Sequence, residues 1–311
     1  MSLVNTKNML EKAYEQNYAI GAFNINNMEV IQGVVEAATE LSSPLILQVS
    51  SGARKYAGNE YLKKLVEVAQ SQTDIPIALH LDHGESFELC KNCIDSGFTS
   101  VMIDGSSLDY EKNIELSARV VEYAHKYNVT VEAELGSLSG IEDNVCVPPS
   151  KSFYTDPEQV KDFVKNTNVD SLAVAIGTSH GAYKFKSHQN PSLRLDILKE
   201  IEEKVPGLPL VLHGASSVMP ELTQTINSYG GNLQDAKGIP ESELKKAAKM
   251  SVCKINVDSD LRLAMTASIR KYLSLNPEKF DPRGYLSCAR DNIKQVVKHK
   301  IQHVMGCAFK A

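Results

Sequence analysis

Residues 75–84 read IPIALHLDHG, an apolar run that ends in polar residues. A short, continuously apolar run rich in Val, Ile and Leu predicts a strand buried on both faces, as in parallel sheets. Similar runs occur along the whole chain. Together they predict strands at Ala19–Ile25, Leu45–Ser50, Ile75–Asp82, Ser100–Asp104, Thr130–Leu135, Ser171–Ile176, Leu208–His213 and Cys253–Val257.

The segments between these runs have the periodicity of helices. In EVIQGVVEAATEL (residues 29–41), for example, apolar residues recur at spacings of three and four. Strands that alternate with helices indicate parallel pairing, and eight such units predict a closed (β/α)8 barrel of the TIM type. A doubly wound open sheet is the structural alternative. We expect one domain over residues 1–311, with additional helices from about Pro277.

The composition is typical of a globular protein and argues against nucleic-acid and membrane partners. A formal net charge of −5 and 42% hydrophobic residues predict a sizeable core and argue against a nucleic-acid partner, which needs clustered Lys and Arg. No apolar run approaches the roughly 20 residues that span a bilayer, and the N-terminal residues lack a signal peptide's apolar core. The cysteines suggest no disulfide framework, and we expect the CxxC of Cys90 and Cys93 to pack inside a helix. These features predict a cytoplasmic protein without membrane contact.

Polar residues stand at the ends of the predicted strands. The active sites of β/α barrels lie at the C-terminal ends of their strands, so these residues are expected to converge on one rim. His83, His180 and His213 each precede a glycine at or after such an end. Three imidazoles with one open position are typical of catalytic zinc. We therefore predict a zinc site, with histidines that only hydrogen-bond within the rim as the alternative.

Carboxylates accompany the histidines. Asp82 adjoins His83 and is a candidate general acid or base, with a role in orienting a ligand or capping a helix as the alternative. Asp104 and Glu134 could bind a second divalent cation or orient the histidines. Glu132 shares its face of the predicted strand with Glu134, so we expect one of these two to be structural.

Several groups near the rim suit a phosphorylated ligand. Backbone N–H groups after two of the histidines, a hydroxyl before a helix and nearby polar or cationic side chains could bind an anion. The candidates are Gly181, Lys184, Gly214, Ser216, Asn256, Asp258, Arg262 and Arg283. The sequence has neither a Walker loop nor a GxGxxG motif, which argues against nucleotides. The long segment Ser137–Pro157, with several Gly and Pro, predicts a loop that could act as a lid.

With these residues assembled, the chain resembles the class II, metal-dependent fructose-1,6-bisphosphate aldolases. The motifs that carry the resemblance run nearly end to end: YAIGAFNINNMEV, HLDHG, EAELG, GTSHGAYKFK, LHGASS, KINVDSD and EKFDPRGYL. The fold of that family is the eight-stranded barrel, which agrees with the strand pattern.

The resemblance implies a role for each candidate. Zinc would be held by His83, His180 and His213, Asp82 would be the acid/base at the C4 hydroxyl, and Glu142 on the predicted loop would handle the C3 proton. Contacts to the substrate and its C1 phosphate would come from Ser50, Gly181, Lys184, Gly214, Ser216, Asn256, Asp258 and Ser259. Arg262 and Arg283 would bind the C6 phosphate, with Arg262 reaching in from a neighbouring subunit of a dimer or tetramer. A monovalent cation, Na+ or K+, is common near the C1 phosphate in the family.

The implied reaction is the reversible, zinc-dependent cleavage of fructose 1,6-bisphosphate to dihydroxyacetone phosphate and glyceraldehyde 3-phosphate, a step of glycolysis and gluconeogenesis. Tagatose 1,6-bisphosphate, which differs at C4, is the alternative substrate. A Schiff-base aldolase with Lys184 or Lys254 as nucleophile is a further alternative that the histidines disfavour. A non-catalytic regulatory barrel is disfavoured by the intact candidate ligands.

Overall fold

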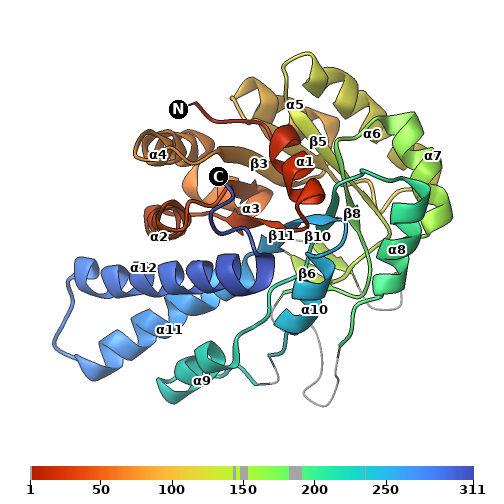
Figure 1. Ribbon diagram of the computed structural model, residues 1–311. Helices are drawn as coiled ribbons and strands as arrows, with labels where there is room; N and C mark the ends of the chain where they lie inside the picture. The colour runs from red at the N-terminus through yellow and green to blue at the C-terminus, as the bar shows by residue number, and fades with distance from the viewer. Residues whose placement is uncertain (1, 143–144, 148–152, 182–190, 235) are drawn as a thin grey trace.

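The computed structural model describes residues 2–142, 145–147, 153–181, 191–234 and 236–311 (Figure 1). Its centre is a closed barrel of parallel strands in the order β1-β11-β10-β8-β5-β4-β3-β2. The predicted TIM-type barrel is therefore confirmed, and the open sheet is excluded. The barrel strands are β1 (Ile20–Asn24), β2 (Leu45–Ser50), β3 (Ile77–Gly84), β4 (Ser100–Ile103), β5 (Thr130–Leu135), β8 (Ser171–Val174), β10 (Leu210–Leu212) and β11 (Val252–Val257).

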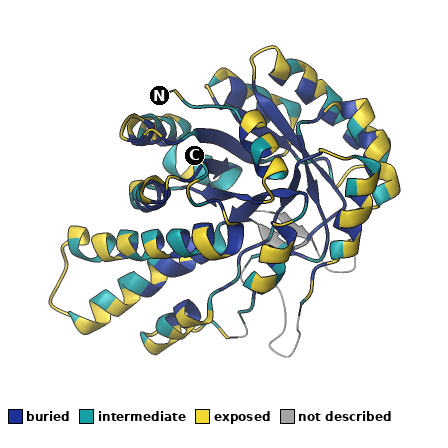
Figure 2. Cartoon of the chain, in the orientation of Figure 1, coloured by how far each residue is buried: buried dark blue, intermediate teal, exposed yellow. Residues whose placement is uncertain are grey.

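Helices surround the barrel and bury one face against it, as Figure 2 shows. Their inner faces carry the predicted apolar spacing, as in α2, where Val30, Ile31 and Val34 are buried. The helices are α1 (Lys7–Glu15), α2 (Met28–Glu40), α3 (Ser51–Ala57), α4 (Asn59–Ser71), α5 (Phe87–Asp95), α6 (Tyr110–His125), α7 (Pro157–Thr167), α8 (Leu195–Lys204), α9 (Pro220–Ser228), α10 (Glu241–Ala247), α11 (Ser259–Leu275) and α12 (Pro282–His299). A π-helical segment, Lys300–Met305, follows α12.

The barrel strands are buried along almost their whole length, as their apolar sequences predict, and only His83 at the end of β3 is partly exposed. All six residues of β2 and all six of β5 are buried. Cys90 and Cys93 on α5 are buried and free, and burial raises the pKa of the Cys90 thiol to about 12. The CxxC therefore packs in the core, as predicted, and has little thiolate for redox or metal chemistry.

The described part of the segment Ser137–Pro157 contains strands, which the sequence did not predict. It contains β6 (Ser139–Glu142) and β7 (Val145–Val147), which pair antiparallel, and β6 also pairs with β9 (Ser179–His180). The prediction of a plain loop was wrong here. β-Branched residues at 141, 145 and 147 favour a strand, but the Gly and Pro residues around them obscured that preference.

The C-terminal helices form an arm. α11 and α12 pack against each other as an antiparallel pair that extends away from the barrel (Figure 1), and α12 also packs on α2. The turn between them carries Phe280, which is 90% exposed. The predicted additional C-terminal helices are thus confirmed.

None of the helices that the structure describes is both long enough and apolar enough to cross a bilayer.

Candidate active site

An extra residue near the end of β3 brings two consecutive side chains to the rim. Leu81 lies opposite Val101 of β4, and Gly84 lies opposite Ile103. Three residue steps along β3 therefore match two along β4, so β3 contains one extra residue. His83, in this bulge, has a φ of 49°, a left-handed conformation that is uncommon outside glycine. Regular strand alternation would point Asp82 and His83 to opposite faces. The bulge lets both approach the same partner, His213.

The three predicted histidines converge. His83 Nε2 lies 2.8 Å from His213 Nδ1. The ring of His180, on β9, has its centroid 5.2 Å from that of His83 and 6.3 Å from that of His213. One ring nitrogen from each residue lies within 4.8 Å of the others. The structure therefore gathers residues far apart in sequence into one cluster at the C-terminal rim.

His83 and His213 face each other through one ring nitrogen each, and a carboxylate lies at hydrogen-bond distance from the second nitrogen of each ring. His83 Nδ1 lies 3.0 Å from Asp104 Oδ2, and His213 Nε2 lies 2.7 Å from Glu132 Oε1. Burial, together with the neighbouring His83, lowers the pKa of His213, so the ring is neutral at neutral pH. The neutral His213 ring then donates its Nε2–H to Glu132 and keeps a lone pair on Nδ1, the nitrogen that faces His83.

The type and spacing of these ring nitrogens fit a metal ion. One nitrogen from each of the three rings points into the same small space, and His83 Nε2 lies only 2.8 Å from His213 Nδ1. Zinc prefers imidazole nitrogen, commonly in sets of three with one open position. Carboxylates that fix the tautomer of each ligand are the usual outer partners of such a site. The donor set thus fits zinc at His83, His180 and His213.

Asp104 and Glu134 form a second group with His83. One ligand atom from each lies within 4.8 Å of the others, and Glu134 Oε2 is 4.0 Å from His83 Nδ1. Asp104 also accepts hydrogen bonds from the backbone N–H and hydroxyl of Ser106. Burial would raise the pKa of Asp104, but the bonds from His83 and Ser106 outweigh it and hold the pKa well below its usual range. Asp104 is therefore ionised and fixed against His83.

Asp82 is fully buried and held by three side-chain amides. Its Oδ2 accepts from Asn24 Nδ2 at 2.7 Å and Gln48 Nε2 at 3.1 Å, and its Oδ1 accepts from Asn256 Nδ2 at 3.2 Å. The carboxylate lies 4.0 Å from His213 Nδ1. Asn24 and Gln48 were missed by the sequence reading. The signal for both was a polar residue within an otherwise apolar strand.

Glu132 has the structural role that was expected for one of the two glutamates of β5. Besides His213, it pairs with Lys254 Nζ at 2.9 Å inside the barrel, where both side chains are almost completely buried. His80 Nε2 lies 3.4 Å from the same ammonium group. A lysine committed to a buried ion pair is a poor Schiff-base nucleophile, which further disfavours that alternative for Lys254. Lys184 lies outside the described residues.

Several of the predicted phosphate-binding groups have well-defined local contacts. Gly214 has a φ of 58°, and a Cβ there would meet the Ser179 carbonyl oxygen at 2.5 Å, so only glycine fits. Ser216 accepts the Asp258 N–H at 3.3 Å. Ser50 caps α3 by accepting the Ala53 N–H. A cavity of about 470 Å³ is lined in part by Gly181, Ser259, Arg262 and Arg270.

The two predicted arginines lie far apart. Arg262, in the first turn of α11, makes a bidentate ion pair with Asp258 of its own chain. Arg283 begins α12 at the tip of the arm, where its side chain is 89% exposed and pairs with Asp281. α11 has 17 residues and is about 25 Å long. The structure therefore does not bring Arg283 to the histidines of its own chain.

Glu142 ends a strand that adjoins a predicted metal ligand. In the pairing of β6 with β9, Gly140 lies opposite His180. A Cβ on Gly140 would lie 2.5 Å from the His180 carbonyl oxygen, which explains the glycine. The backbone of Glu142 is thus placed beside the cluster, while its side chain lies outside the described residues.

Comparisons with known proteins identify the family of this chain. The family model described as fructose-bisphosphate aldolase class-II matches residues 4–310. A fructose-bisphosphate aldolase of Treponema pallidum is 54% identical, covering 100% of this chain and 98% of that protein. One from Giardia intestinalis is 50% identical over 97% of this chain and 93% of that protein. The crystal structure of the YdjI aldolase from Escherichia coli K12 superposes with a TM-score of 0.80 at 29% identity, with complete coverage of both chains. The chain belongs to the class-II fructose-bisphosphate aldolase family.

Proposed function

We propose that the chain catalyses the reversible aldol cleavage of fructose 1,6-bisphosphate to dihydroxyacetone phosphate and glyceraldehyde 3-phosphate, with zinc held by His83, His180 and His213. The observation that carries the proposal is the cluster of three histidine ring nitrogens within 4.8 Å of one another, with the buried carboxylate of Asp82 4.0 Å from His213 Nδ1. Bound zinc would supply Lewis acidity, which polarises the ketone carbonyl and stabilises negative charge on its oxygen.

The protein's own groups would move the protons. Asp82 takes the proton of the C4 hydroxyl as the C3–C4 bond breaks, and returns it in the reverse direction. Its three amide partners hold the carboxylate in one orientation, which favours proton transfer along a fixed line. Glu142 delivers a proton to C3, a role supported by the pairing of its strand with the strand of His180.

Other groups would fix the substrate. Gly181, Gly214 and Ser216, with Lys184, bind the C1 phosphate. Asp104 orients His83, and the group of His83, Asp104 and Glu134 would also suit a second divalent cation. Substrate hydroxyls are contacted by the remaining candidates, Ser50, Asn256, Asp258 and Ser259. A monovalent cation near the C1 phosphate stays a prediction of the family resemblance.

Cleavage assays with both bisphosphates test this function. Fructose 1,6-bisphosphate is expected to be cleaved with the higher kcat/KM. The C4 epimer displaces its hydroxyl from Asp82, and such misplacement costs on the order of 10²-fold. Coupled assays of the triose phosphates released from each sugar give the ratio. Preference for tagatose 1,6-bisphosphate would change the substrate, and cleavage of neither sugar would refute the proposed function.

We propose further that the enzyme is a homo-oligomer in which an arginine from one subunit binds the C6 phosphate in the next. The sequence suggested Arg262 for this role, but Arg283 suits it better. Arg283 stands at the exposed tip of an arm about 25 Å long, away from the histidines of its own chain. Arg262 pairs with Asp258 at the rim of its own barrel.

Mixing two inactive variants shows which arginine binds the C6 phosphate in the site of a neighbouring subunit. Loss of a bidentate contact to phosphate is expected to cost about 2–4 kcal/mol, or roughly 30- to 1,000-fold in kcat/KM. If Arg283 acts in the neighbouring site, Arg283→Ala mixed with Asp82→Asn yields hybrid dimers with one intact site. Random reassortment then restores about a quarter of wild-type activity.

Arg262→Ala mixed with Asp82→Asn is the matched control. An arginine that serves its own site gives no recovery, because each site of the hybrid then retains a lesion. Subunit exchange is checked with differently tagged chains. Recovery with Arg262→Ala alone would assign the shared role to Arg262, and recovery with neither variant would mean that each site is built from one chain.

We also propose that the protein is cytoplasmic. The free thiols among the described residues, most of them buried, suit a reducing cytoplasm.

A further inference from the structure

A buried ion cluster lies behind the loop that follows β10. Lys300, in the π-helical segment near the C-terminus, is 1% exposed, and Asp260 of α11 is 0% exposed. Lys300 Nζ lies 2.9 Å from Asp260 Oδ2 and 2.7 Å from Glu241 Oε1. It also donates to Ser217 Oγ at 2.5 Å. An ammonium group this deeply buried is costly unless its partners satisfy it, and here three of them do.

The carboxylate of Asp260 grips the loop through its backbone. Asp260 Oδ2 accepts the Ser217 N–H at 2.9 Å, and Oδ1 accepts the Val218 N–H at 2.8 Å. Val218 has a φ of 52°, a strained conformation for a β-branched residue. Such a conformation persists only where surrounding contacts enforce it, and the pair of bonds to Asp260 supplies that enforcement.

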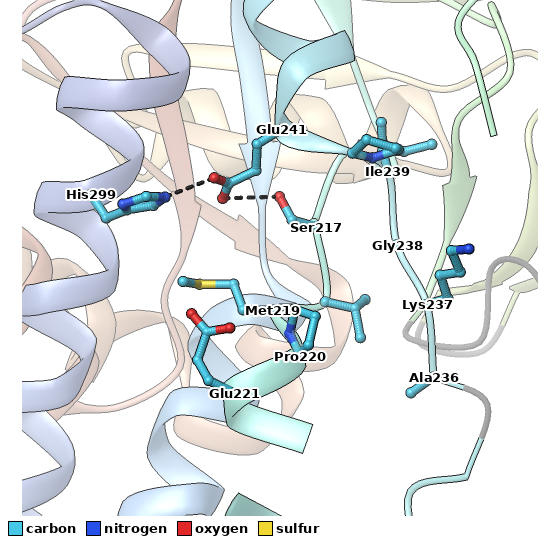
Figure 3. A pocket seen from close by; sticks show the side chains of 12 residues that line it. Ser217, Met219, Pro220, Glu221, Ala236, Lys237, Gly238, Ile239, Glu241 and His299 are labelled. Carbon is cyan, nitrogen blue, oxygen red and sulfur yellow. Dashed lines mark hydrogen bonds and ion pairs between the residues drawn. The ribbon is translucent and has the colours of Figure 1, made fainter. Parts of the chain in front are cut away.

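The loop is also packed closely against Gly238. Gly238 packs so closely that a Cβ would meet the Ser216 carbonyl oxygen at 2.3 Å. In Figure 3, Ser217, Glu241 and His299 lie on one wall of a cavity of about 600 Å³, with Glu241 bonded to both neighbours. Ser217 and Val218 thus line this cavity, and the same loop begins with Gly214 directly after His213.

The charges in the cluster are stable. Burial alone would lower the pKa of Lys300, but the carboxylates of Asp260 and Glu241 raise it above its ordinary value. Burial would raise the pKa of Glu241, but Lys300 and His299 lower it. Lys300 is thus an ammonium and Glu241 a carboxylate at neutral pH, and the cluster is a permanent clamp rather than a switch.

We propose that Lys300 is a positioning residue for phosphate binding: through Asp260 and Glu241 it fixes the loop from Gly214 to Val218 without touching the substrate. The inference rests on the proposed function, in which Gly214 and Ser216 bind the C1 phosphate. It assigns a role in substrate affinity to a residue from the far C-terminal end of the chain.

Lys300→Met tests the proposal, because methionine keeps most of the side-chain length and removes the charge. The KM for fructose 1,6-bisphosphate is expected to rise about tenfold or more with kcat within about threefold, because an interaction with the phosphate acts equally in ground and transition states. The Kd of dihydroxyacetone phosphate, measured by calorimetry, is expected to rise by the same factor, while zinc content stays at the wild-type level.

Lys294→Met is the matched control. Lys294 is a partly buried lysine of α12 that pairs with Glu36 and Glu40 on α2, far from the loop in the chain. It is expected to leave KM and Kd unchanged. A Lys300→Met variant that melts earlier but keeps the wild-type KM and Kd would reduce the cluster to a stabilising role and overturn the proposal.

Glu241→Gln keeps the inference testable if Lys300→Met does not fold. This variant retains the Asp260–Lys300 pair and removes one charge from a carboxylate that is partly exposed. A smaller rise in KM and in the Kd of dihydroxyacetone phosphate, about two- to fivefold, supports positioning, and no change in either overturns it. Wild-type protein that cleaves no bisphosphate would refute the proposed function instead, which separates the two failures.

Discussion

Removal of the metal is expected to abolish cleavage of fructose 1,6-bisphosphate, and added zinc is expected to restore it. Without the ion, the ketone carbonyl loses its Lewis acid, and Lys254, which is tied to Glu132 within the barrel, is a poor Schiff-base nucleophile to replace it. Loss of Lewis-acid assistance removes several kcal/mol of transition-state stabilisation, or at least about 10³-fold in rate. The measurement is the rate after EDTA dialysis, with and without added zinc, alongside the metal content.

Borohydride is the control for the competing chemistry. A Schiff-base enzyme is trapped irreversibly when borohydride reduces the imine formed with dihydroxyacetone phosphate. This enzyme is expected to survive that treatment with its activity intact. Full activity in protein shown to be free of metal, or trapping of one lysine by borohydride, would contradict the zinc assignment.

Asp82→Asn and Glu142→Gln are expected to separate the two proton transfers of the reaction. Asp82→Asn keeps the shape of the side chain and removes the base, so kcat for cleavage should fall about 10²- to 10⁴-fold. Exchange of the C3-derived proton of dihydroxyacetone phosphate with deuterated water does not involve the C4 hydroxyl. That exchange should persist within a few-fold in the Asp82 variant.

Glu142→Gln should lose both activities, because cleavage and exchange share the proton at C3. Exchange is followed by NMR and cleavage by a coupled assay, and zinc content and melting temperature report whether each variant is intact. Asp82→Asn that cleaves at the wild-type rate would remove Asp82 from the mechanism. Exchange at the wild-type rate in Glu142→Gln would assign the C3 proton to another group.

The sequence predicted the barrel well, because each strand is a short apolar run and each helix has a regular apolar face. It also located the histidines, since polar residues at strand ends have few roles other than the site. It could not predict the conformation of His83, because a left-handed residue in a strand depends on the register with β4. Nor could it find Asn24 and Gln48 as partners of Asp82, because strand pairing across the barrel decides which polar side chains meet.

The remaining differences between the predicted and the observed positions of site residues come from the packing of helices that are far apart in sequence. Arg262 and Arg283 are both arginines near the start of a helix, and only the packing of α12 along α11 shows that one lies at the rim and the other at the tip of the arm. Lys300 has no local motif at all. Its role depends on partners contributed by two other helices.

The bulge in β3 bears on how such a site can change over evolutionary time. On a regular strand, functional side chains must be separated by a residue that faces away, so a base and a ligand for the metal would sit two codons apart. The extra residue at His83 lets Asp82 and His83, the proposed base and metal ligand, lie side by side, and the proposed site then depends on the number of residues at this point as well as on their identity. Elsewhere in the strand, one apolar residue can replace another. Loss of a single codon at the bulge, by contrast, would turn one of the two groups away from the substrate. Insertions and deletions in this strand should therefore be purged more strictly than substitutions.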